Sequence, residues 1–234
     1  MMMTTPMTLP ARLVALLTAA TTFACEATHA QSGGEVKMPV AARAEAPKRA
    51  PVATEGLAGK LVSLGYMGLF LTLDDAELDR LWRQDSGGAA LAALVTDPSA
   101  DGEARFLAAE AMFRKQPGYP SAGDVPGLRP VYVEGLRRSQ LANIWGMPGE
   151  ADGPAGQHLL ALGEPTAAQL VPLLQDGRRI FYAGSEDATV GEAYEYRIKD
   201  LAAFFIARLR NLPYAVRKTP VERDAEIARL RAAL

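Results

Sequence analysis

Apolar residues recur at helical spacing from Gly56 to the end of the chain, and this pattern predicts a series of amphipathic helices. The first helix follows a start signal at residues 72–75, where an acid stands three positions after a hydroxyl. Its apolar face consists of Leu78, Leu81 and Trp82. A short helix then follows Gly87 and Gly88, and its apolar side consists of Leu91, Leu94 and Val95. Asp97 and Pro98 end it, because the residue before a proline avoids helical geometry.

Two further helices are indicated by their apolar stripes and by their ends. The segment from Gly102 to Arg114 places on a single stripe Ala104, Leu107, Ala108, Ala111 and Met112. Near the C-terminus, Thr219 and Glu222 form a capping box with Pro220 at the first helical position. The buried side of this last helix is expected to consist of Ile227, Leu230 and Leu234. Such a helix either covers the last apolar face of a helical stack or pairs with a second subunit.

The chain repeats one pattern of apolar and polar positions. Residues 91–97 match residues 170–176, and residues 104–109 match residues 198–203. Ala104 follows Asp97 by seven positions, whereas Ile198 follows Asp176 by 22. The second copy therefore carries an insertion of about 15 residues between its two helices, within the stretch 177–196.

The repeated pattern resembles the HEAT repeat, a helical hairpin that stacks on its neighbours into an α-solenoid. The resemblance rests on three features: a first helix ending in Leu-x-x-Leu-Leu/Val-x-Asp, an apolar–basic pair, and two adjacent alanines three residues after the basic one. Pro172 also suits a family whose first helices are often kinked. The resemblance implies an all-α fold of HEAT-like stacked helical hairpins, an alpha-alpha superhelix, over residues 56–234. A generic helical bundle is the alternative, and at least three hairpins are needed for a stable stack, so residues 56–84 and 126–141 would supply irregular units.

The N-terminal 30 residues have the pattern of a secretory signal. Arg12 is followed at once by the short apolar run 13–20, and Thr28 and Ala30 provide small side chains for cleavage after Ala30. Residues 31–55 are rich in Pro, Ala and Gly and lack periodicity, which indicates a disordered linker. We therefore expect an exported bacterial protein, periplasmic or secreted, with a helical domain over residues 56–234. Met1, Met2, Met3 and Met7 each remain possible starts.

Lipid attachment at Cys25 is the alternative to cleavage after Ala30. A bacterial lipobox usually has a leucine three residues before the cysteine, but Thr22 stands there, and only Ala24 fits the pattern. A lipid on Cys25 would anchor the protein to a membrane, and we expect no other membrane contact. Cys25 is the only cysteine, so the domain must fold without an internal disulfide.

Composition and charge narrow the classes of function. The formal net charge of −2 argues against a nucleic-acid-binding surface, which would be strongly basic. After export the chain keeps one histidine, His158, and we expect it to be a structural imidazole with satisfied hydrogen bonds. A metal site or a Ser-His-acid centre would therefore depend on this single histidine, and we expect neither. No cofactor motif is present, so we expect no cofactor and a binding protein rather than an enzyme.

Candidate binding residues lie in the two irregular stretches. The candidate binding residues of the insertion are Arg178, Arg179, Tyr182, Glu186 and Asp187. The alternative is a purely structural role, in which the insertion is a self-packed hairpin and its arginines pair with these acids. Glu186 and Asp187 are adjacent, so in an extended segment they would point apart. Trp145, in the Gly- and Pro-rich loop 143–156, either anchors a partner or fills the core.

Three functions follow as expectations. Solenoids present concave surfaces, so the resemblance implies a scaffold that binds a protein or peptide at the cell envelope. The first alternative is a hydrolytic enzyme that uses acids of the loop 177–196, and the second is a purely structural envelope component. The sequence leaves the partner and the oligomeric state open.

Overall fold

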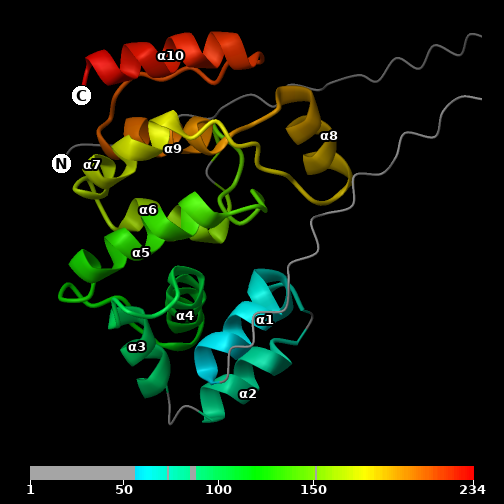
Figure 1. Ribbon diagram of the computed structural model, residues 1–234, viewed down its shortest axis with the longest axis vertical. Helices are drawn as coiled ribbons and strands as arrows, with labels where there is room; N and C mark the ends of the chain where they lie inside the picture. Colours follow the sequence, from blue (N-terminus) through cyan, green and yellow to red (C-terminus); the bar gives the residue numbers. More distant parts are fainter. Residues whose placement is uncertain (1–55, 73, 85–87, 151) are drawn as a thin grey trace, which may run out of the picture. The chain divides into compact units, whose positions relative to one another are not determined.

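Every regular element in the described part of the chain is a helix, so the predicted all-α fold is confirmed. The structure, a computed structural model, describes residues 56–72, 74–84, 88–150 and 152–234 (Figure 1). Its helices are α1 (Leu57–Phe70), α2 (Ala76–Gln84), α3 (Ala89–Thr96), α4 (Gly102–Lys115), α5 (Val125–Arg138), α6 (Pro154–Ala161), α7 (Thr166–Leu170), the 3-10 helix η1 (Val171–Gln175), α8 (Ser185–Tyr194), α9 (Ile198–Leu209) and α10 (Pro220–Ala232). The predicted signal, linker and lipid-attachment residue Cys25 lie outside the described residues.

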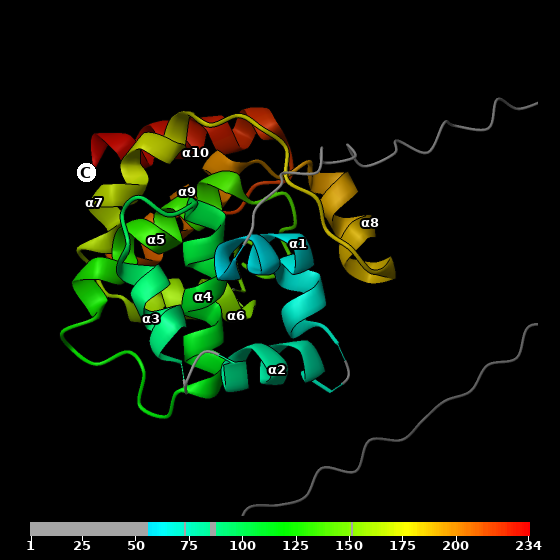
Figure 2. The ribbon, with the colours of Figure 1, turned by 60° about the horizontal axis from the view of Figure 1, so that its bottom comes forward.

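Helix α4 lies at the centre of the N-terminal helices and packs against α1, α3 and α5 (Figure 2). All five residues of its predicted stripe are buried. Phe106 and Glu110, which lie off that stripe, are buried as well, at 4% and 3% exposed. A helix surrounded on three sides buries more than the single face of an amphipathic surface helix, and this explains why the predicted core was too small.

The two copies of the repeated pattern bury equivalent positions. The matched pairs that are at most 1% exposed are Leu91 and Leu170, Ala104 and Ile198, Leu107 and Leu201, Ala108 and Ala202, and Ala109 and Ala203. The matched aspartates also form the same turn. The Asp97 carboxylate accepts a hydrogen bond from the Ser99 amide at 2.9 Å, and the Asp176 carboxylate accepts one from the Arg178 amide at 3.1 Å. The repeat is therefore visible in burial and in local geometry.

Pro172 changes the type of helix in the second copy. Helix α7 ends at Leu170, and the chain continues directly as the 3-10 helix η1, with Pro172 in its first turn. Proline has no amide hydrogen for the α-helical ladder and clashes with the preceding turn. The kink expected at Pro172 thus takes the form of a switch from α-helix to 3-10 helix.

Helix α1 bends at Gly65, where φ is 63° and ψ is −179°. This backbone conformation strongly favours glycine. Leu61 lies before the bend and Leu69 after it, and both side chains are fully buried. The bend therefore gives α1 two short segments, each with its own buried contact.

Several expectations are corrected at element ends. Helix α2 begins at Ala76, whose amide hydrogen bonds to the Asp74 carboxylate at 3.3 Å, so the start signal around Thr72 was placed too early. Leu234 lies beyond the end of α10 and is 40% exposed, whereas Ile227 and Leu230 are buried as predicted. The capping box of Thr219 and Glu222 is confirmed.

Candidate functional site

The insertion of the second copy begins as an extended segment, residues 178–182, held on both edges. Its partner on one edge is the segment 140–142, which runs parallel, and on the other edge 196–198, which runs antiparallel. Two backbone hydrogen bonds close each edge: Phe181 N to Gln140 O at 3.0 Å, Ala142 N to Phe181 O at 2.7 Å, Ile180 N to Tyr196 O at 3.0 Å and Ile198 N to Arg178 O at 3.0 Å. The segment is therefore fixed in register relative to the helices.

Side chains of this extended segment alternate between the interior and solvent. Ile180 and Tyr182 are buried at 3% and 8% exposed, and the Tyr182 hydroxyl donates to the Gly146 carbonyl at 3.2 Å. Arg179 and Phe181 face outward, and Phe181 is 62% exposed. Successive side chains of a strand point to opposite sides. Tyr182, selected from the sequence, thus belongs to the interior, and its neighbour Phe181 is the residue that a partner can reach.

Helix α8 follows the extended segment and lies at the edge of the helical unit in Figures 1 and 2. The sequence predicted a loop here. Gly191 is the only buried residue of α8, so the helix has no apolar stripe from which it could be recognised. Acids in its first turn, Glu186 and Asp187, favour this helix start because they complement the positive end of the helix dipole.

Asn143 fastens the start of α8 to the loop that precedes α6. Its amide group donates to the Ala183 carbonyl at 2.9 Å and to the Asp187 carboxylate at 2.7 Å. Its carbonyl oxygen accepts from the Ala183 amide at 2.7 Å. The two acids do not lie in an extended segment, since both belong to the first helical turn of α8. Glu186 is exposed, and Asp187 is bound to Asn143.

The arginines of the insertion have partners other than the expected acids. Arg178 pairs with Asp176 and donates to the Arg137 carbonyl at 2.5 Å, which joins the end of η1 to the last turn of α5. The hydrogen bonds from Arg178 lower the pKa of Asp176 and raise that of Arg178. Arg179 lies 3.7 Å from Glu195, and both side chains are about half exposed. Arg178 thus serves as a structural cross-link, and Arg179 remains available at the surface.

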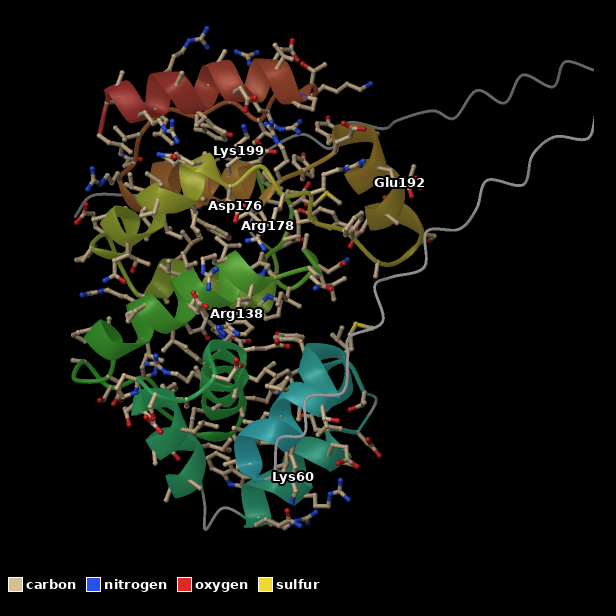
Figure 3. The ribbon with its side chains drawn as sticks, viewed as in Figure 1. Lys60, Arg138, Asp176, Arg178, Glu192 and Lys199 are labelled. Carbon is tan, nitrogen blue, oxygen red and sulfur yellow. The ribbon has the colours of Figure 1, made fainter. Side chains whose placement is uncertain are left out.

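A row of charged side chains continues from this cross-link, from the last turns of α5 to the start of α4. Figure 3 labels Arg138, Asp176 and Arg178. Glu134 pairs with both Arg137 and Arg138, and Arg138 also binds Asp101 at 2.8 Å. These pairs hold the pKa of Glu134 below its usual value. Because each charge has an opposite neighbour and is partly exposed, the row contributes little stability per pair and is not an isolated ligand site.

Trp145 lies in the core and is fully buried. Its indole nitrogen donates to the Ser139 hydroxyl at 2.8 Å, and its ring stacks on Phe106 with 5.4 Å between centroids. Phe205 packs against it edge to face. A side chain in this position supports the loop from beneath and cannot anchor a partner on the surface.

Glu110 forms the centre of a polar cluster that the sequence did not reveal. Its carboxylate is 3% exposed and accepts hydrogen bonds from the hydroxyls of Tyr66, at 3.1 Å, and Tyr132. His158 approaches the same carboxylate from α6. Burial, and then the negative charge of Glu110, raise the pKa of Tyr66 and Tyr132 above the usual range. The hydrogen bond to Glu110 fits the expected structural role of His158.

Among the described residues, the elements are helices, and the exposed aromatic side chain of Phe181 lies on an insertion that backbone hydrogen bonds hold on two edges. Within the described ranges, no three side chains of His, Cys, Asp or Glu gather in a way that could hold a metal ion. In the same part of the chain, no helix is both long and apolar enough to cross a bilayer. Comparison with protein families, curated proteins and solved structures finds no match to the chain.

Proposed function

We propose that the protein is an exported, HEAT-like helical scaffold that binds a protein partner on the insertion face. The insertion face consists of Arg179, Phe181 and the exposed acids of α8, Glu186 and Glu192. One observation carries the proposal: Phe181 is 62% exposed although backbone hydrogen bonds fix its segment on both edges. Ordered, exposed aromatic side chains are typical anchors of protein interfaces.

The repeat supports the scaffold part of the proposal. Matched positions of α3 and α7, and of α4 and α9, are buried in both copies of the repeated pattern. Helix α9 also packs against both η1 and α10. Helix α10 places Ile227 and Leu230 against the preceding helices and exposes its other face. A polar outer face on the last helix is what a stack of helical hairpins needs at its end.

The side chains of the insertion face indicate what the partner should present. Phe181 needs an apolar surface, and Arg179, which is about half exposed, can bind a carboxylate or an aromatic ring. Glu186 and Glu192 on α8 favour basic residues next to that surface. Export, with cleavage after Ala30 or lipid attachment at Cys25, would restrict the partner to the periplasm or the exterior.

Photo-crosslinking from two exposed apolar positions tests this function. A crosslinking amino acid at position 181 should trap one discrete adduct in cells, identified by mass spectrometry. The control is the same amino acid at Val221, which is 79% exposed on α10. The trapped protein, once purified, should bind the unmodified chain, and Phe181→Ala should weaken binding at least about thirtyfold, as loss of about 2 kcal/mol predicts.

Two results would contradict the proposal. One is the same set of adducts from positions 181 and 221, because that pattern reflects random collisions. The other is unchanged affinity of the purified partner for the Phe181→Ala and Arg179→Ala variants. Circular dichroism of each variant separates loss of binding from loss of folding.

A further inference from the structure

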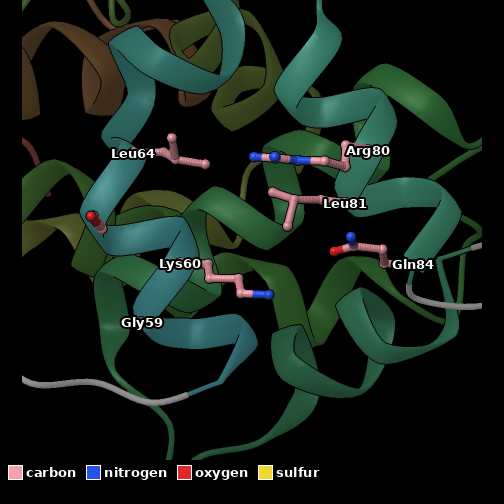
Figure 4. A pocket seen from close by; sticks show the side chains of 7 residues that line it. Gly59, Lys60, Leu64, Arg80, Leu81 and Gln84 are labelled. Carbon is pink, nitrogen blue, oxygen red and sulfur yellow. The ribbon is translucent and has the colours of Figure 1, made fainter.

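A second surface feature lies between α1 and α2, apart from the residues of the insertion face. It is a cavity of about 440 Å³, within the size range of small-molecule sites. Polar groups of its lining are Lys60, Ser63, Arg80 and Gln84, and apolar ones are Leu64 and Leu81. In Figure 4 the side chains of Lys60 and Gln84 extend into the space between the helices, and Arg80 reaches across toward α1.

Among the described residues, the lining of this cavity includes two cations and no carboxylate. Arg80 pairs with Glu77 one turn away on its own helix, and that acid does not line the cavity. Lys60 has no ion pair among the described residues. The protein as a whole has a formal net charge of −2, so a cavity whose described charged residues are both positive departs from the average surface and attracts anions.

A larger cavity near the C-terminus provides an internal comparison. It has a volume of about 580 Å³ and lies between the segment 212–217 and α10. Its two arginines, Arg217 and Arg229, both bind the Glu226 carboxylate, at 2.9 and 2.8 Å. Their positive charge is therefore already matched inside the lining, so of these two cavities the one between α1 and α2 is better suited to an anionic ligand.

We propose that the cavity between α1 and α2 binds a small organic acid with an aliphatic body. Its carboxylate would lie between the Lys60 ammonium and the Arg80 guanidinium, with Ser63 and Gln84 as further hydrogen-bond donors. Its aliphatic part would pack on Leu64 and Leu81, of which Leu81 is only 3% exposed. Charge from two helices combined with an apolar floor selects a carboxylate with a hydrocarbon chain over a bare inorganic anion.

NMR titration of the full chain with three matched probes tests the proposal. Hexanoate has both the charge and the chain, 1-hexanol has only the chain, and inorganic phosphate has only the charge. Hexanoate should shift the amide signals of residues 59–64 and 80–84, and the two other probes should bind there at least about fivefold more weakly. Added salt should weaken hexanoate binding, because the attraction involves partly exposed charges.

Variants assign the effect to individual cations. Lys60→Gln and Arg80→Gln should each weaken hexanoate binding about fivefold to tenfold. The matched controls Lys218→Gln and Arg83→Gln remove equally exposed charges that do not line the cavity, and they should leave the affinity unchanged. The α2 pair of Arg80 and Arg83 is the sharper comparison, since both changes lie on the same helix.

Three outcomes would overturn the proposal. Hexanoate shifts spread over the whole chain would show that no site exists. Equal binding of hexanol or phosphate would show that charge and chain do not act together. Equal effects of Lys60→Gln and Lys218→Gln would show that only net charge matters. None of these results bears on the insertion face, whose partner is tested by a separate experiment.

Discussion

The Nδ1 atom of His158 lies 2.9 Å from a carboxylate oxygen of Glu110, a residue 48 positions earlier in the chain. The imidazole ring also stacks on Phe113, with 3.9 Å between the ring centroids. Through Glu110, four helices meet at one buried carboxylate: α1 contributes Tyr66, α5 contributes Tyr132, and α6 contributes His158 to the acid on α4. This cluster therefore acts as a polar joint inside an otherwise apolar core.

Replacing Glu110 with alanine should destabilise the protein by about 3 kcal/mol. The variant leaves the hydroxyls of Tyr66 and Tyr132 without their acceptor, and each unsatisfied buried group costs about 1–3 kcal/mol. Urea unfolding followed by circular dichroism measures the effect. The control Glu192→Ala, on the exposed face of α8, should change stability by less than about 0.5 kcal/mol. Equal unfolding midpoints for both variants would show that the joint contributes nothing.

Stability should fall steeply above pH 10. Burial raises the pKa of Tyr66 and Tyr132 above the tyrosine value of 10, and it raises the pKa of Tyr196 to about 12. The unfolded chain therefore releases protons near pH 10 that the folded chain retains. Stability is complete below pH 10 and declines above it, by about 1.4 kcal/mol per pH unit for each such tyrosine.

Urea unfolding at half-unit steps from pH 8 to pH 11.5 measures this slope. Tyr132→Phe removes one of the groups that ionise on unfolding, so its stability should decline less steeply above pH 10 than that of the unchanged chain. Parallel curves for the two proteins would exclude Tyr132 as a source of the alkaline instability, whatever the variant costs at neutral pH.

Arg223 should be essential for docking of α10. Its side chain is fully buried, and its Nε atom lies 3.1 Å from the carboxylate of Asp200, which is also fully buried. Its other nitrogens donate to four backbone carbonyls, those of Tyr194, Glu195, Arg217 and Lys218. Arg223→Met should cost about 3 kcal/mol, because the change leaves these four carbonyls without their donor and removes one of the two arginines that pair with Asp200, the other being Arg197 at 2.9 Å.

A double variant identifies the source of that cost. Adding Asp200→Asn to Arg223→Met should recover no stability, since Asp200 still pairs with Arg197 and the second change weakens that pair as well. Arg231→Met, on the exposed side of α10, is the control for loss of an arginine from that helix. A loss of less than about 1 kcal/mol for Arg223→Met would contradict the docking role.

Asn143→Ala should loosen the start of α8 without unfolding the helical unit. The variant removes the hydrogen bonds of Asn143 to Ala183 and Asp187. Amide hydrogen exchange in residues 183–187 should accelerate at least about tenfold, while the free energy of global unfolding falls by about 1 kcal/mol. Gln140→Ala alters an exposed side chain but keeps the backbone carbonyl that holds Phe181, so its exchange pattern should stay unchanged. Uniform acceleration across the chain would contradict a local role for Asn143.

Helices that bury an apolar stripe were predictable from the sequence, and helices without one were not. Residues 102–114 and 220–232 combine a stripe with a clear start, and the observed α4 and α10 follow these patterns closely. Helix α8 buries only Gly191, so its sequence offers no periodic signal. A periodic apolar pattern appears only in a helix that buries one of its faces, so an exposed helix cannot be predicted from this pattern.

The residues of the insertion face depended on register, which the sequence alone did not fix. Unusual composition identified the stretch 177–196, but the choice between Phe181 and Tyr182 depends on a shift of one position. That register is set by segment 140–142, about 40 residues earlier in the chain. Ile180, Phe181 and Tyr182 are all apolar or aromatic, so the sequence shows no alternation that would have indicated the buried side.

The buried polar residues Glu110 and Arg223 could not be predicted, because their roles depend on contacts with residues distant in the sequence. Glu110 appeared as one polar position among the alanines of a helix, and Arg223 as an ordinary charge on the last one. Each has a partner far away in the sequence, His158 for Glu110 and Asp200 for Arg223. A single sequence carries no record of such pairings, whereas local caps such as that of Thr219 depend on neighbours and were predicted correctly.

Backbone hydrogen bonds hold the chain on both sides of α8. Most of the residues of the helix can therefore be exchanged without moving the segments that flank it. Apart from Gly191 and the partly buried Tyr194, its residues add little to the core, so its charge can change with little loss of folding stability. Gly191 sets the limit of such exchange, because a Cβ atom at this position would come within 2.6 Å of the Tyr182 ring.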